Sequence, residues 1–154
     1  MFLTVHATTA LIIAKIAPNP IVAFLGGFIS HYLLDGIPHG DEDFFAKFDG
    51  KKWKLVVGTI AAIDFSIMGL WLIFLLYQNQ LPNLNNAMAA VVGSILPDFL
   101  NGLHILTDAK IFNPFAKINQ LSHRLMTKKP TPYRIGFFYQ AIFFAAIIYL
   151  LFKL

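Results

Sequence analysis

The chain contains no cysteine and few charged residues. Without cysteine, disulfide bonds and thiolate metal sites are excluded, so any bound metal must be held by histidine and carboxylate side chains. Only 13% of the 154 residues are charged, whereas soluble domains average roughly 25%. This shortage of charge indicates that much of the folded surface does not face water.

What the chain has in excess is apolar surface. Hydrophobic residues make up 57% of it, 16 residues are phenylalanine, and the mean hydropathy is +0.65. One soluble core of this size cannot bury so much apolar surface, so we expect a membrane to cover it. The length suits one domain, and we expect residues 1–154 to form a single membrane-embedded helical domain. The N-terminus lacks the basic start and cleavage site of a signal peptide, so we interpret it as mature structure.

Five apolar stretches predict an all-α fold, a polytopic transmembrane helical bundle. The expected helices cover residues 2–16, 20–36, 52–77, 85–107 and 134–152. The third is long enough to span a bilayer alone, whereas the first two are short and could instead form a re-entrant hairpin. A proline at position 97 should kink the fourth.

A sixth, shorter helix is expected between the last two apolar stretches. Residues 114–127 carry apolar side chains at helical spacing, with lysine and arginine between them. This pattern is typical of a helix that lies in the membrane interface. We therefore predict a short interfacial helix over 114–127.

Basic residues are concentrated in two loops. Residues 37–54 hold four lysines and residues 108–134 hold six basic residues, which leaves only Lys15 and Lys153 for the other side. In a five-helix chain both loops and the N-terminus share one side, which the positive-inside rule assigns to the cytoplasm. This clustering indicates membrane topology rather than nucleic-acid binding, so we expect membrane lipids and no nucleic acid as partners.

All five histidines are expected in the cytoplasmic half of the membrane. His31 and Asp35 are four residues apart, so they share a helix face and could share an ion; His104 and Asp108 repeat the spacing. Imidazole and carboxylate ligands predict a divalent metal, zinc in the first place, with manganese or iron as alternatives. Each pair also has a structural interpretation, as a hydrogen-bonded pair or a helix cap.

Two aspartates lie in otherwise apolar helices. They are Asp64 and Asp98, and inserting a carboxylate into a membrane costs about 2.5–3.5 kcal/mol. Each therefore needs a partner, which could be a cation or a polar group of a neighbouring helix.

The chain carries a weak internal similarity. Residues 27–37 and 93–103 align without gaps, and the matches include Gly27 with Gly93 and Leu34 with Leu100. The similarity indicates that the second and fourth apolar helices play equivalent roles.

Four short motifs together resemble a family of small bacterial inner-membrane proteins, the membrane-bound metal-dependent hydrolases. They are VHATTA (5–10), HYLLDGIPH (31–39), GSILPDF (93–99) and SHRLMT (122–127). The second also resembles the signature of the zinc-dependent phospholipase C and P1-nuclease superfamily. The resemblance implies metal ligation by His6, His31, Asp35, His39 and Asp98, and it suggests that His123 and Arg124 lie near the site. Lys128 stands where the family has a further histidine, so one or two metals are expected rather than three.

These observations predict a membrane-embedded metal-dependent hydrolase in the bacterial inner membrane. It would act on a phosphoester or lipid-linked substrate at the cytoplasmic face, where the metal would lower the pKa of a water molecule. Asp64 or Asp98 would serve as general base, and Arg124, Lys128 and Lys129 would attract the anionic group. Two alternatives remain open: an ion or proton transport component that uses the two intramembrane aspartates, and a non-catalytic scaffold that docks a partner through residues 41–54.

Overall fold

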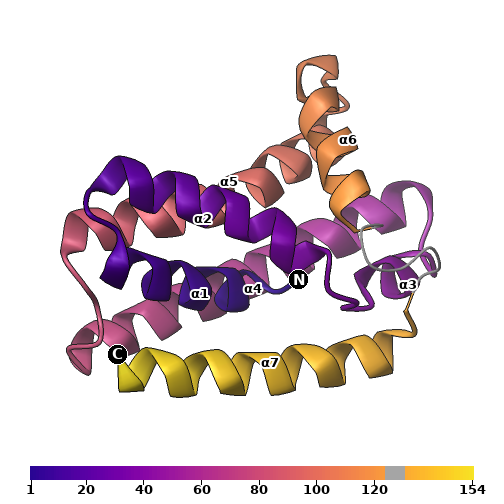
Figure 1. Cartoon of the computed structure of the whole chain (residues 1–154). Coiled ribbons are helices and arrows are strands. Elements are labelled where there is room, and N and C mark those ends of the chain that lie inside the picture. Colours follow the sequence, from indigo (N-terminus) through magenta and orange to yellow (C-terminus); the bar gives the residue numbers. More distant parts are fainter. Residues whose placement is uncertain (124–130) are drawn as a thin grey trace.

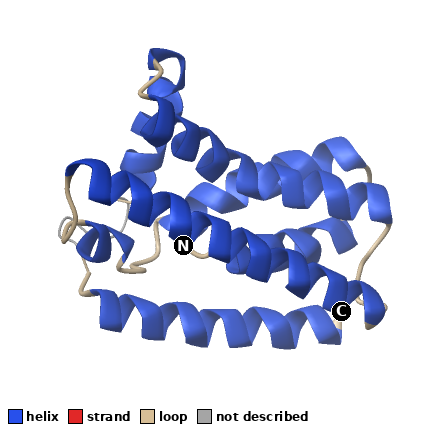
Figure 2. Cartoon of the chain, turned by 180° about the vertical axis from the view of Figure 1, so that it is seen from behind, coloured by secondary structure: helices blue, strands red, loops and turns tan. Residues whose placement is uncertain are grey.

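The computed structural model describes residues 1–123 and 131–154, and the only regular elements in these two ranges are helices (Figure 2). In chain order they are α1 (Leu3–Ile16), α2 (Pro20–Asp35), α3 (Asp41–Phe45), α4 (Gly50–Tyr77), α5 (Leu84–Thr107), the 3₁₀ turn η1 (Lys110–Phe112), α6 (Asn113–Ser122) and α7 (Tyr133–Lys153). The predicted all-helical architecture is confirmed for these ranges.

The five apolar helices begin and end within two residues of their predicted ranges. Three of them, α4, α5 and α7, are long and apolar enough to cross a membrane, whereas α1 and α2 are shorter. The 14 residues of α1 rise only about 21 Å, against about 30 Å for the hydrocarbon core of a bilayer. Five full membrane passages therefore stay a prediction.

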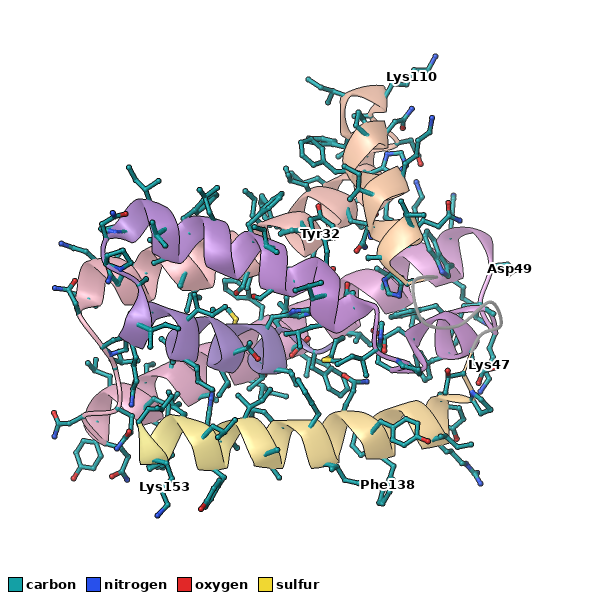
Figure 3. The ribbon with its side chains drawn as sticks, in the orientation of Figure 1. Tyr32, Lys47, Asp49, Lys110, Phe138 and Lys153 are labelled. Atoms are coloured by element: carbon teal, nitrogen blue, oxygen red, sulfur yellow. The ribbon has the colours of Figure 1, made fainter. Side chains whose placement is uncertain are left out.

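The long helices run side by side, and the shorter elements gather at one end of them (Figure 1). α3 lies at the end where α4 and α7 begin, the C-terminus lies at the opposite end, and α2 finishes between the two (Figure 1). Figure 3 shows Lys47 and Asp49 at the α3 end, Lys153 at the other end, and Phe138 pointing away from the bundle. The lysine-rich loop of residues 37–54 thus lies at the end opposite the C-terminus, whereas Lys110 of the second loop lies at the tip of the part that projects above the bundle (Figure 3).

The helix predicted over 114–127 corresponds to α6, and the part from Arg124 onward lies outside the described residues. α6 runs across the direction of the long helices (Figure 1). It buries its polar Asn119 and Ser122 against the bundle and exposes Ile118 and Leu121. An outward apolar face on a crosswise helix is the arrangement expected at a membrane surface. The short elements α3 and η1 were not predicted, because neither is long enough to produce a periodic pattern.

Helix α1 begins inside the bundle rather than at its end. The backbone N–H of Leu3 donates to Asp64 Oδ2 at 2.8 Å, and the N–H of Phe2 donates to Gln140 Oε1 at 3.0 Å. Asp64 lies in the middle of α4, and Gln140 lies in the first half of α7. The first amides of a helix have no partner within the helix. The neighbouring helices therefore supply the acceptors.

Helices α2 and α5 approach each other closely at two glycines. A Cβ atom on Gly27 would lie 2.1 Å from the carbonyl oxygen of Ala90, and one on Gly93 would lie 2.2 Å from that of Phe24. Small residues allow this close packing of membrane helices. Gly27 and Gly93 are also matched positions of the internal similarity, and each faces the backbone of the other helix. The two repeated segments thus occupy equivalent places in the fold.

We expect Gly27→Ala and Gly93→Ala to destabilise the protein, because the added methyl group would force the α2 and α5 backbones apart. Overpacking of this kind typically costs about 1–3 kcal/mol. Unfolding of the purified protein, followed by circular dichroism, measures the loss. Gly69→Ala is the matched control, since nothing lies within 4 Å of a Cβ at that α4 position. Equal stability of all three variants would contradict the close approach.

Candidate metal centre

Four potential metal ligands from three helices converge in the interior. They are His6 of α1, His31 and Asp35 of α2, and Asp98 of α5, and one ligand atom from each lies within 4.8 Å of the others. The side chains of the first three are fully buried, whereas that of Asp98 is 28% exposed. Two imidazoles and two carboxylates form a ligand set that suits a divalent cation. We call these four residues the His/Asp cluster.

The His31 ring is fixed by a backbone acceptor. Its Nδ1 lies 2.9 Å from the carbonyl oxygen of Ser94 on α5. Because a carbonyl can only accept, Nδ1 carries the proton and Nε2 holds the lone pair. That Nε2 lies 3.3 Å from Asp35 Oδ2, yet neither atom has a hydrogen-bond partner. Two buried acceptors facing each other indicate a place for a cation.

Asp35 is the central residue of the cluster. Its Oδ1 lies 3.1 Å from His6 Nε2 and 2.8 Å from the amino group of Met1. The His6 ring stacks on the His31 ring with centroids 4.4 Å apart. On the other side, Asp98 Oδ1 lies 3.8 Å from His31 Nε2. The two oxygens of Asp35 therefore face different partners, and Oδ2 is the one left for a further ligand.

His39 and His123 lie beside the His/Asp cluster rather than within it. His39 Nδ1 donates to the carbonyl oxygen of Ile37 at 2.7 Å, which leaves its buried Nε2 without a hydrogen-bond partner, 3.3 Å from Asp41 Oδ2. His123 Nε2 lies 3.6 Å from Asp35 Oδ2. Burial disfavours the imidazolium form and lowers the pKa of both His39 and His123. Both rings are thus held neutral, each with a lone pair available.

Helix α7 holds His39 in place through its backbone. Gln140 Nε2 donates to the His39 carbonyl oxygen at 2.9 Å, while its Oε1 accepts from the N–H of Phe2. A Cβ on Gly136 would lie 2.4 Å from the same His39 oxygen, so only glycine allows the loop to pack here. The neighbouring Gly40 has φ = +83°, a conformation that favours glycine. One glutamine therefore couples the start of α1 to the loop that carries His39.

A cavity of about 1500 Å³ opens beside the cluster. Asp98, His39, Asp41 and His123 all contribute to its lining. The rest of the wall is largely apolar and comes from α3, α4, α5, α6 and α7. A ligand in the cavity would therefore meet polar residues beside the cluster and a wall that is apolar over most of its surface.

The other sequence-predicted residues lie apart from the cluster. Asp64 accepts from Leu3 N–H and, at 3.4 Å, from the Thr4 hydroxyl, so it caps α1. His104 and Asp108 do not face each other across a shared ion: Asp108 pairs with Lys54, and His104 Nδ1 faces the Ala109 carbonyl oxygen. Arg124, Lys128 and Lys129 lie outside the described residues.

Sequence reasoning missed three residues that shape the site. Ser94 contributes only its carbonyl oxygen, and Gln140 and Gly136 act on backbone groups of a distant loop. Backbone partners leave no chemical signature in a sequence. Gln140 alone gave a signal, as an isolated polar residue in the apolar stretch 134–152.

Comparison with known proteins finds no matching family model, no similar curated protein and no similar solved structure. The resemblance to the metal-dependent hydrolases therefore stays a prediction from four short motifs. Whatever is inferred about function rests on the geometry of the His/Asp cluster and its surroundings.

Proposed function

We propose that the chain is a membrane-embedded, metal-dependent hydrolase that acts on a phosphoester or related lipid-linked bond at the cytoplasmic face of a bacterial inner membrane. The observation that carries the proposal is the His/Asp cluster. Side chains far apart in sequence bring their ligand atoms within 4.8 Å of one another in a buried place. Buried polar atoms without a hydrogen-bond partner are rare in proteins. The cluster contains three of them: His6 Nδ1, His31 Nε2 and Asp35 Oδ2.

The ligand types favour zinc, with manganese or iron as the alternatives. Nitrogen and carboxylate oxygen in equal number fit a four-coordinate zinc site. A divalent ion held here would act as a Lewis acid toward a phosphoryl oxygen and would lower the pKa of a water molecule. The hydrogen bond from His31 to Ser94 gives the ligand the second-sphere support common at metal sites. His123 adjoins the cluster through Asp35 Oδ2, and His39, whose ring packs against that of His123, would extend the ligand set.

The reaction proposed is addition of water across a P–O bond. The water oxygen attacks phosphorus, the bond to the alcohol oxygen breaks, and the alcohol leaves with a proton that the water supplied. His123 lines the cavity, is held neutral by burial and lies 3.6 Å from Asp35, so we assign it the proton transfer. Arg124 follows it in the chain and would attract the anionic substrate.

We assign Asp64 to capping rather than to catalysis. Both of its oxygens accept hydrogen bonds from the start of α1. The same contacts weigh against the transport alternative, in which Asp64 would carry an ion along α4. The scaffold alternative, in which residues 41–54 dock a partner, predicts that the protein has no turnover, which an assay decides.

Metal analysis of the purified protein tests the cluster directly. After incubation with zinc and desalting, we expect the wild type to retain about one ion per chain. His31→Ala and Asp35→Asn should lose it, because each removes a central ligand. His104→Ala is the matched control, since this histidine lies apart from the cluster. Equal metal content in all four proteins would overturn the proposal.

Hydrolysis of methyl p-nitrophenyl phosphate distinguishes the role of Asp98 from that of Asp64. Asp98→Asn should abolish most turnover, because it removes a cluster ligand that faces the cavity. In Asp64→Asn the amide oxygen still accepts from Leu3 N–H, so we expect a loss of less than about tenfold, whereas removal of a general base lowers the rate by about 10²–10⁴-fold. A loss of the larger size, at unchanged thermal stability, would give Asp64 a catalytic role.

Single-cysteine labelling tests the orientation without background, because the chain has no cysteine of its own. We expect a membrane-impermeant maleimide to label Gln78→Cys in intact bacterial host cells, and to label Lys51→Cys only after the membrane is permeabilised. The reverse pattern would invert the topology and move the cluster to the outer half of the membrane.

A further inference from the structure

The cavity beside the His/Asp cluster is too large and too apolar for a small polar substrate alone. Its volume of about 1500 Å³ exceeds the roughly 300–1,000 Å³ of sites that hold drug-sized ligands. Nine aromatic side chains contribute to its wall, among them Trp53, Phe65, Phe99 and Phe137. Asp98 and the two neighbouring histidines, His39 and His123, place polar groups in this wall next to the His/Asp cluster. A mainly apolar wall with polar groups beside the cluster matches an amphiphile.

The cavity exists because of two features of the helices around it. α1 begins midway along the bundle and leaves the space beyond its first residue unfilled by helix. The buried residues of α4 are Met68 and Leu75, and both follow Asp64 in the chain. The far half of α4 packs against its neighbours, as in the Trp71–Phe144 ring contact at 5.6 Å. Its near half, from Gly50 to Asp64, instead forms part of the cavity wall.

Part of this wall reaches the outer surface of the long helices. Phe65 of α4, Phe99 of α5 and Phe137 of α7 contribute to the cavity, yet each is more than half exposed. These three helices are the ones long and apolar enough to cross a membrane. In a bilayer the exposed faces of these helices would contact acyl chains, which would place the cavity wall next to the hydrocarbon region. An apolar chain could enter beside α4 without crossing water.

We propose that this cavity holds the apolar chain of a lipid phosphate ester, taken directly from the membrane, while the phosphate lies at the His/Asp cluster. The proposal rests on the proposed function and names the substrate class of the same site. The apolar chain of this lipid is an acyl, alkyl or prenyl group, because the aromatic and aliphatic side chains of the cavity wall favour an apolar ligand. Water adds across the P–O bond as described above, and the chain-bearing product returns to the bilayer.

A homologous series of alkyl p-nitrophenyl phosphates tests the proposal, since every member has the same scissile bond. In the wild type, kcat/KM should rise at least about tenfold from the methyl to the dodecyl ester, because buried methylene groups favour binding. Ala61→Trp narrows the cavity and should remove this rise, with the methyl ester cleaved as before. Ala62→Trp is the matched control, because Ala61 lines the cavity and its neighbour lines a separate groove on α4.

A second measurement does not depend on turnover. A phosphate ester with a photoreactive diazirine in its alkyl chain should cross-link to the cavity residues Trp53 and Ile95, located by mass spectrometry. Ala61→Trp should remove these cross-links, and Ala62→Trp should keep them. If the wild type cleaves all esters equally and no cavity cross-link forms, the lipid proposal is wrong while the hydrolase proposal stands. If no ester is cleaved but the cross-links form and respond to Ala61→Trp, the cavity binds lipid and the hydrolase proposal fails.

Discussion

The first amides of α1 need hydrogen-bond acceptors from other helices, because a helix offers its own first amides no partner. Asp64 of α4 and Gln140 of α7 provide them, and Asn86 of α5 serves the other end by donating to the Ala17 carbonyl oxygen at 2.8 Å. The long helices thus hold a short one at a fixed depth. The position of α1 along the bundle determines where His6 meets Asp35 and where the cavity begins. The site therefore depends on the hydrogen bonds that the long helices make to the backbone of α1.

The close contact of α2 with α5 also determines the geometry of the candidate metal site. Gly27 and Gly93 let the two backbones approach, and one turn further along the same helices His31 donates to the Ser94 carbonyl oxygen. A bulkier residue at either glycine would move the ring away from its acceptor. The packing of small residues and the orientation of a metal ligand are therefore one feature of the fold. The internal similarity of the sequence lies at this contact.

The sequence predicted the helices well because apolar length is a strong local signal. It also identified His6, His31, Asp35 and Asp98, since histidine and aspartate are conspicuous in apolar stretches, and the structure brings these four together. It could not separate Asp64 from them, because a carboxylate that caps a helix and one that binds a metal look alike in one dimension. The sequence also could not show that His39 and His123 lie beside the cluster rather than within it. The place of His39 depends on how the loop after α2 packs on Gly136. The membrane orientation and the metal were inferred from charge and ligand type and stay predictions.

The cluster also has a consequence for biogenesis. Its ligands come from α1, α2 and α5, and α7 adds the glutamine that secures both α1 and the His39 loop. A ribosome delivers these elements in order, so the polar groups of the first hairpin exist before any partner from α5 or α7 has been made. Their burial must await the end of synthesis. The α1–α2 hairpin therefore reaches its final depth only as a late step of assembly, guided by helices that follow it in the chain.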